Sequence, residues 1–122
     1  MILIAIKLLF VLIAAHFVAD FSLQTEPMAR EKRRASDTEL QKIVPWYWWL
    51  TAHSMTHGFL TWVVLGLGLQ FYGAVYIAMA ETVAHWFIDF GKCEGYYGLK
   101  VDQALHLICK IMWVSYVLAF LQ

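Results

Sequence analysis

Apolar residues gather in four long stretches along the chain, separated by shorter polar or glycine-containing segments. These stretches cover residues 2–23, 46–69, 71–90 and 101–121. Each reaches the roughly 20 residues that an α-helix needs to cross the hydrocarbon core of a bilayer. The pattern predicts an all-α fold, an integral membrane bundle of four transmembrane helices that residues 1–122 form as a single domain.

Three connecting segments separate the expected helices. The first, residues 24–44, holds most of the charge and is expected to form a polar loop or a short amphipathic surface helix. Pro27 breaks the chain after the first span, and Pro45 suits the first turn of the second helix. A tight, uncharged turn is expected near Gln70, and a short glycine-rich loop at residues 91–100.

The composition fits lipid better than water. Of the 122 residues, 61% are hydrophobic and only 15% are charged, too few to cover the surface of a soluble domain of this size. The formal net charge is zero, which argues against nucleic acid binding through a basic surface. Cys93 and Cys109 lack C-x-x-C spacing and are expected to serve in packing.

The connecting loops predict the orientation. Lysine and arginine are concentrated in the first and third loops and absent from the second. The positive-inside rule therefore places loops one and three in the cytoplasm and both termini outside, in a multi-pass protein of the cell inner membrane. The aromatic run 46–49 is expected to anchor at the headgroup level, and the basic run 30–34 to contact lipid headgroups. Residues 2–23 lack the features of a cleaved signal and are expected to be retained.

Polar side chains recur four residues apart inside every expected span, and residues four apart share one face of a helix. They are His16, Asp20 and Gln24 in the first span, His53 and His57 in the second, Glu81, His85 and Asp89 in the third, and Asp102, His106 and Lys110 in the fourth. Counted from the cytoplasmic ends of the spans, all five histidines fall in one layer together with four or five carboxylates.

Ionisable groups cost about 2.5–3.5 kcal/mol each in hydrocarbon, so they persist where they face the interior and satisfy one another. Imidazole with carboxylate is a ligand set for a divalent metal, with zinc the leading ion and manganese or iron as alternatives. Helical bundles build such sites from inward-facing pairs, and more than six ligands would allow two metals. The candidate metal ligands are His53, His57, His85, His106, Asp20, Asp89 and Asp102.

Other interpretations of the layer stay open. A purely structural polar network joining four helices needs no ion. A haem needs only two histidines between helices, although the flanking carboxylates argue against the apolar pocket that a haem requires. Proton or ion transfer along the stripe is a further interpretation.

Four segments carry a resemblance to a known family: H-F-V-A-D-F-S-L-Q (16–24), H-S-M-T-H (53–57), E-T-V-A-H-W-F-I-D-F (81–90) and D-Q-A-L-H (102–106). In this order, and over essentially the whole chain, they resemble the small bacterial and phage membrane proteins grouped as domain of unknown function 3307 (DUF3307). The resemblance implies that the site is formed by His16, Asp20, Gln24, His53, His57, Glu81, His85, Asp89, Asp102 and His106.

A looser likeness links the chain to inner-membrane metal-dependent hydrolases, which also place His and Asp pairs on short membrane helices. Those proteins have an H-R-x-x-T-H-S type motif, where this chain has only H-S-M-T-H at residues 53–57.

The leading hypothesis is a membrane-embedded, metal-dependent hydrolase at the level of the cytoplasmic headgroups, acting on a lipid phosphate ester. Glu81 or His16 would serve as general base toward a metal-bound water, and Gln24 would orient the substrate. Expected partners are membrane lipid and a second copy or another membrane protein. The alternatives are a non-enzymatic interaction or assembly module, such as a phage or host accessory protein, and a proton or ion conduit.

Overall fold

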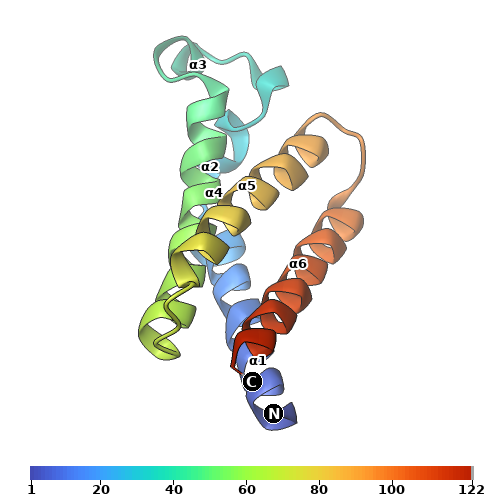
Figure 1. The fold of residues 1–122 in the computed structure, drawn as a ribbon. Helices are drawn as coiled ribbons and strands as arrows, with labels where there is room; N and C mark the ends of the chain where they lie inside the picture. The colour runs from blue at the N-terminus through green and yellow to red at the C-terminus, as the bar shows by residue number, and fades with distance from the viewer. Residues whose placement is uncertain (122) are drawn as a thin grey trace.

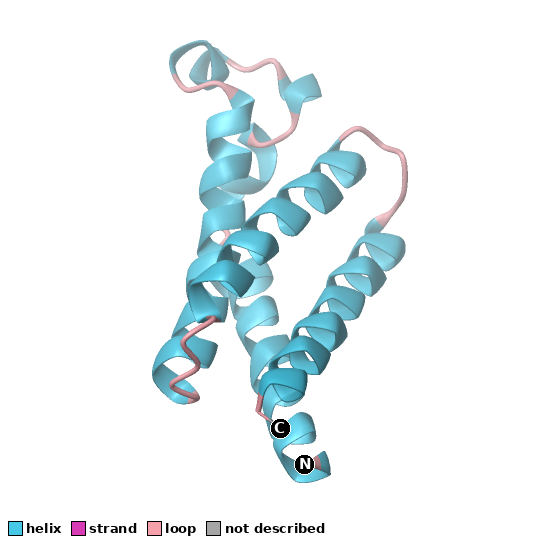
Figure 2. Cartoon of the chain, viewed as in Figure 1, coloured by secondary structure: helices cyan, strands magenta, loops and turns pink. Residues whose placement is uncertain are grey.

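The structure, a computed structural model, describes residues 1–121. Throughout this range the chain consists of helices joined by loops and turns, as Figure 2 shows. Its six α-helices are α1 (Ile2–Phe17), α2 (Glu26–Glu31), α3 (Glu39–Ile43), α4 (Trp46–Trp62), α5 (Ala74–Cys93) and α6 (Leu99–Phe120). Two π-helical turns, η1 (Val18–Leu23) and η3 (Val63–Gly68), extend α1 and α4, and η2 (Arg34–Ser36) is a 3-10 turn. The predicted all-α class is confirmed.

The segment between α1 and α4 is built from short capped helices rather than from an irregular loop. The backbone of Gln24 is extended and ends the first helix. The hydroxyl of Thr25 then accepts a hydrogen bond from the amide of Met28, and the hydroxyl of Thr38 accepts one from the amide of Gln41. Threonine is a favoured N-cap because it satisfies an amide that the first helical turn leaves free. These two caps set where α2 and α3 begin.

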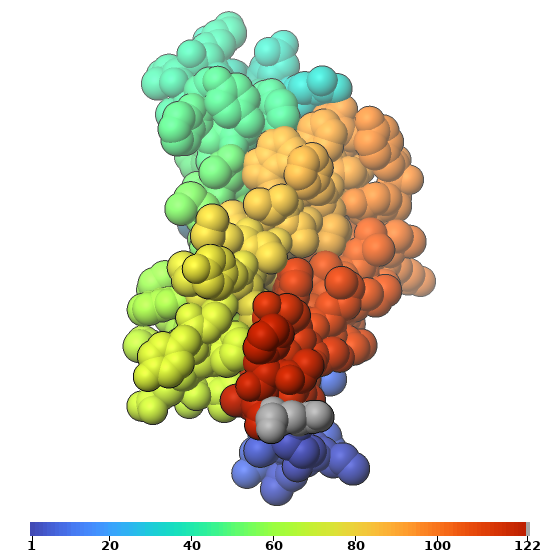
Figure 3. Space-filling model, in the orientation of Figure 1, coloured from blue at the N-terminus to red at the C-terminus, as the bar shows by residue number. Residues whose placement is uncertain are grey.

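The four long helices α1, α4, α5 and α6 are arranged as a bundle (Figure 1). Both termini and the turn between η3 and α5 lie at one end, whereas α2, α3 and the connection from α5 to α6 lie at the other, called the loop end below. The helices α4 and α5 pack most extensively, and α6 contacts both α1 and α5. The first turns of α1 project beyond the neighbouring helices (Figure 3).

The interior is polar at the loop end and apolar toward the termini. Buried polar and charged side chains outnumber buried apolar ones in the described residues. The buried apolar side chains of the terminal half form one cluster of Leu8, Leu12, Leu65, Ala74, Ile77, Val114 and Val117. Large apolar side chains are instead exposed along all four long helices. This distribution is the reverse of the one that water imposes on a soluble domain.

Two helices of the described chain are long and apolar enough to cross a membrane, namely Ile2–Leu23 and Leu99–Phe120. The first coincides with the expected span 2–23, and the second starts slightly before the expected residue 101. The helix α4 with η3 matches the expected span 46–69 closely, while α5 lies a few residues beyond the expected 71–90. That all four long helices cross a membrane stays a prediction.

Gly58 brings α4 and α5 into close contact. A β-carbon at this position would collide with the hydroxyl of Thr82 and lie 2.7 Å from the carbonyl oxygen of Ala78. Small residues at a helix interface let backbones approach closely, which strengthens packing between helices. The approach of α4 to α5 matters for function because it sets how near His53 and His57 come to His85.

We predict that Gly58→Ala lowers the stability of the protein by about 1–3 kcal/mol, the usual cost of overpacking an interface. Thermal unfolding in detergent, followed by circular dichroism, measures the effect. Gly98→Ala is the matched control, because a β-carbon at Gly98 would meet no atom within 4 Å. Equal stability of the two variants would show that Gly58 does not limit the approach of α4 and α5.

Candidate metal centre

The five histidines come together in one layer, as their spacing and depth predict. Their side chains are all buried, and the ring centroids of neighbouring histidines lie between 3.5 and 6.3 Å apart. Four long helices contribute to the layer: His16 comes from α1, His53 and His57 from α4, His85 from α5 and His106 from α6.

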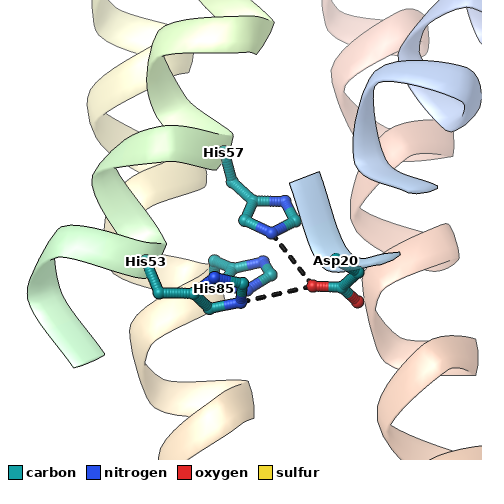
Figure 4. A group of neighbouring side chains, drawn as sticks. All are labelled: Asp20, His53, His57 and His85. Atoms are coloured by element: carbon teal, nitrogen blue, oxygen red, sulfur yellow. Dashed lines mark hydrogen bonds and ion pairs between the residues drawn. The ribbon is translucent and has the colours of Figure 1, made fainter. Parts of the chain in front are cut away.

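Asp20 joins three of these histidines to form the largest group of candidate ligands. Figure 4 shows Asp20 of η1 facing His53 and His57 of α4, with His85 of α5 beside them. One ligand atom from each of the four residues lies within 4.8 Å of all the others. Asp20 Oδ1 is 3.0 Å from His57 Nε2 and 3.2 Å from His53 Nε2. A tetrahedral zinc ion holds nitrogen ligands at about 2.0–2.1 Å and so separates ligand atoms by about 3.3 Å.

Several ring nitrogens of this group lack a hydrogen-bond partner among residues 1–121. They include His53 Nε2 and both nitrogens of His85, all of them buried. Although His53 Nε2 lies close to Asp20 Oδ1, the two atoms do not have the geometry of a hydrogen bond. Buried polar atoms are almost always satisfied, so unsatisfied ones that converge indicate a missing partner. A cation between them would satisfy these nitrogens and the carboxylate together.

Lysines neutralise the neighbouring carboxylates but not Asp20. The buried layer contains four carboxylates, of Asp20, Glu81, Asp89 and Asp102. Glu81 is ion-paired with Lys110, Asp89 with Lys32 and Lys92, and Asp102 with Lys92. In the described chain the side chains that pair with the Asp20 carboxylate are those of His16, His53, His57 and Gln103. If the five histidines are neutral, the four carboxylates are balanced by only three lysines, Lys32, Lys92 and Lys110. One negative charge is then unbalanced, and it lies at Asp20.

Lys32 reaches the layer from the segment between α1 and α4. Its side chain is buried, donates to Gln24 Oε1 at 2.5 Å and is ion-paired with Asp89 of α5. The expectation that the whole basic run 30–34 contacts lipid headgroups is therefore wrong for Lys32. The cause is long-range packing, because Asp89 lies 57 positions further along the chain and no local pattern connects the two residues.

Neighbouring contacts hold this segment in place. Arg34 donates a hydrogen bond to Glu94, the residue that follows the last turn of α5. The carboxylate of Glu31 is buried and accepts hydrogen bonds from Thr38 and Arg30. The Thr38 hydroxyl, together with the Arg30 guanidinium, lowers the pKa of Glu31 below its usual value. The segment is thus held by a contact with the residue after α5 and by hydrogen bonds within the segment.

The three residues expected to act in catalysis have different surroundings. His16 lies inside the layer, with Nε2 3.4 Å from Asp20 Oδ2, and it forms a further candidate group with His85 and His106. Glu81 belongs to none of the candidate groups in the described chain, and its carboxylate accepts hydrogen bonds from Lys110 and Trp113.

Gln24 contacts the layer through Lys32 rather than through a histidine. Its side chain donates to the backbone carbonyl of Asp20 at 3.2 Å and accepts from Lys32. The backbone becomes extended at Gln24, where the π-helical turn η1 ends. Such turns are frequent at functional sites, and this one carries Asp20 itself.

Sequence reasoning missed Gln103, which connects α6 to the layer. Its amide nitrogen donates to Asp20 Oδ2 at 2.8 Å and to Asp102 Oδ2 at 3.0 Å. Its amide oxygen lies 3.2 Å from His16 Nε2. A partner that orients a candidate ligand is typical of the outer shell of metal sites. The available signal was the position of Gln103 beside Asp102, one helical turn before His106.

The family model described as "Protein of unknown function (DUF3307)" matches residues 8–121. The chain belongs to the DUF3307 family. This match confirms the resemblance carried by the four sequence segments, and it includes every candidate ligand of this DUF3307 protein. No curated protein and no solved structure matches the chain, so the likeness to metal-dependent hydrolases has no support from a named relative.

The buried pair of Lys110 and Glu81 yields a stability prediction. Lys110→Met leaves the carboxylate of Glu81 buried without its cation, and removing one partner of such a pair costs about 3–5 kcal/mol. The double variant Glu81→Gln/Lys110→Met removes both charges and is expected to regain most of this loss. Thermal unfolding in detergent measures the stability of both variants. The control is Lys42→Met, which breaks an exposed ion pair and should not change the stability measurably. Equal losses in the single and double variants would contradict the pairing.

Proposed function

We propose that all four long helices of this protein cross the bilayer, with the loop end on the cytoplasmic side of the cell inner membrane. In Ile2–Leu23 and in Leu99–Phe120, only 22% of the most apolar window of each helix is buried inside the bundle. The core helix of a soluble protein would be mostly buried. The helices α4 and α5 also expose large apolar side chains, including Phe59 and Phe87. Since charged loops lie at one end and the uncharged turn at the other, the positive-inside rule supports this orientation.

Within this membrane bundle we propose a divalent metal site, with zinc as the resident ion and Asp20, His53, His57 and His85 as its ligands. The observation that carries the proposal is the Asp20 carboxylate, which no lysine contacts in the described chain, among converging imidazole nitrogens, of which His53 Nε2 and those of His85 have no partner there. Three imidazoles and one carboxylate suit zinc, and Gln103 and His16 contact the same carboxylate. A divalent ion would reverse the sign of the unbalanced charge and leave the centre able to attract an anion.

An anionic ester is the substrate class that such a centre favours, and the function we propose is hydrolysis of a lipid phosphate ester. A bound divalent ion supplies Lewis acidity and lowers the pKa of water to about 7. His16 is the better placed general base, because its Nδ1 has no partner in the described chain, whereas Glu81 is held by Lys110 and Trp113. Gln24, next to Lys32, would orient the substrate at the loop end. The layer lies toward this end, where headgroups would be found.

A non-enzymatic membrane module is the second candidate, and the closed character of the layer favours it. Asp20 is 6% exposed and the histidines are less so. Four protein ligands also fill a tetrahedral zinc ion, as structural sites do. A proton or ion conduit is less favoured. The apolar cluster that contains Leu12 and Val117 lies between the layer and the terminal end, where a conducted ion would have to pass.

Metal content tests the site. We predict about one equivalent of zinc per chain in the detergent-purified protein, and loss of that zinc in Asp20→Asn and His57→Gln. Elemental analysis measures the content, and circular dichroism checks that each variant stays helical. Met55→Ala is the matched control on α4, because its side chain is exposed. Metal-free wild-type protein after zinc supplementation would rule out the site.

Hydrolysis is tested separately with zinc-loaded wild-type protein in phospholipid vesicles. The enzyme is expected to release a phosphate-containing product, and His16→Gln is expected to slow this release while retaining zinc. A module would hold zinc, or stay folded without it, and release nothing.

Cysteine labelling tests the orientation. Single cysteines are introduced as Ala35→Cys or Tyr72→Cys into a Cys93→Ala/Cys109→Ala background. Ala35 lies at the loop end and Tyr72 at the terminal end, and both residues are exposed. A membrane-impermeant thiol reagent added to intact cells is expected to label the Tyr72 variant, because the positive-inside rule places this turn outside. Labelling of the Ala35 variant instead would show the opposite orientation.

A further inference from the structure

A second group of ligand atoms lies beside the first, between α5 and α6 near the loop end. It comprises Asp89, Asp102 and His106, and one ligand atom from each lies within 4.8 Å of the others. His106 Nε2 is 3.4 Å from Asp102 Oδ1 and 3.5 Å from Asp89 Oδ1. Both His106 Nε2 and Asp102 Oδ1 are buried and have no hydrogen-bond partner within residues 1–121. Ligand atoms that converge without pairing again indicate a missing partner.

Asp89 connects this second group to the first one. Its Oδ1 faces His106, while its Oδ2 lies 3.4 Å from His53 Nε2 and 3.8 Å from His85 Nε2. The rings of His85 and His106 are stacked, with centroids 4.1 Å apart. The two oxygens of one carboxylate are thus directed to different groups. Oδ2 is also ion-paired with Lys32, which leaves Oδ1 as the oxygen available to an ion of the second group.

We propose that Asp89, Asp102 and His106 form a second cation site next to the first one, in which a divalent ion replaces the ammonium group of Lys92. This inference rests on the proposed function, because it adds an ion to the centre formed around Asp20. Lys92 Nζ lies 3.0 Å from both Asp89 Oδ1 and Asp102 Oδ2, where it neutralises these carboxylates. Its side chain is 19% exposed in the last turn of α5, so the ammonium can turn toward solvent.

The second site has the open coordination that the first site lacks. Three protein ligands leave at least one position for water or for an oxygen of a phosphate ester, as in catalytic metal sites. Two neighbouring ions can stabilise both the attacking and the leaving oxygen of a displacement at phosphorus. The second site therefore deepens the proposed hydrolysis by providing a position where an anionic phosphate ester can bind.

The two sites are expected to differ in affinity. Asp20 is free of lysine contacts, so an ion at the first site meets no competing ammonium. An ion at the second site must displace Lys92 and lies near Lys32, which also contacts Asp89. Metal is therefore expected to bind in two steps. The first site fills at a lower metal concentration than the second.

Manganese titration of the metal-stripped protein in detergent tests the inference. Manganese accepts imidazole and carboxylate ligands, and electron paramagnetic resonance detects magnetic coupling between two neighbouring ions. Wild-type protein is expected to bind two equivalents, with a coupled signal at the second. His106→Gln and Asp102→Asn should each bind one equivalent without coupling. Lys92→Met should bind the second equivalent about tenfold more tightly or better, since the repulsion of an ammonium a few ångströms away is lost.

Lys42→Met, at an exposed lysine, is the matched control and should titrate like the wild type. A single equivalent in the wild type, retained in His106→Gln and lost in His57→Gln, would overturn the second site and leave the first intact. Unchanged affinity in Lys92→Met would overturn the exchange with Lys92. No binding to the wild type at all would instead overturn the proposed function. The gain expected for Lys92→Met cannot arise from misfolding, so the test does not depend on loss of binding alone.

Discussion

The carboxylate of Asp89 is buried near the loop end of the bundle and is contacted from four elements, by Lys32 from the first connecting segment, Lys92 from its own helix, His53 from α4 and His106 from α6. A buried carboxylate is costly unless cations and hydrogen-bond donors surround it. The segment between α1 and α4 must therefore fold back over the loop end to bring Lys32 to Asp89. The positions of α5 and α6 are also constrained, because Lys92 contacts carboxylates on both helices. The polar centre thus determines how the connections run as well as how the helices pack.

The polar and apolar halves of the interior have complementary roles. In the terminal half, apolar side chains such as Leu12 and Val117 hold the helices together by packing. In the loop half, ion pairs and histidines take over this role, so the helices are joined there by groups that can also bind a ligand. The exterior is apolar along both halves. The division leaves the polar layer connected to one end of the molecule and separated from the other, which fits a site that acts on one side of a membrane.

Features that depend on local spacing could be predicted from the sequence. The length of each apolar stretch located the four long helices, and the four-residue spacing of His53 and His57 placed both rings on one face. Features that depend on long-range packing could not. Lys32 belongs to a basic run that is typical of a solvated surface, and its burial follows from a carboxylate far along the chain. The π turn that carries Asp20 has no recognisable local signal either.

Access to the layer separates an enzyme from a structural module. The sides of the bundle are covered by apolar side chains and the terminal half of the interior is closed by packing, so an anionic headgroup would have to approach from the loop end. There, Lys32 and Lys92 are the cations nearest the centre, and both are engaged with Asp89. An approaching phosphate offers these ammonium groups a new anionic partner, while a divalent ion offers Asp89 a new cation. This exchange of partners would open the layer without leaving a buried charge unpaired. A purely structural network does not need such an exchange.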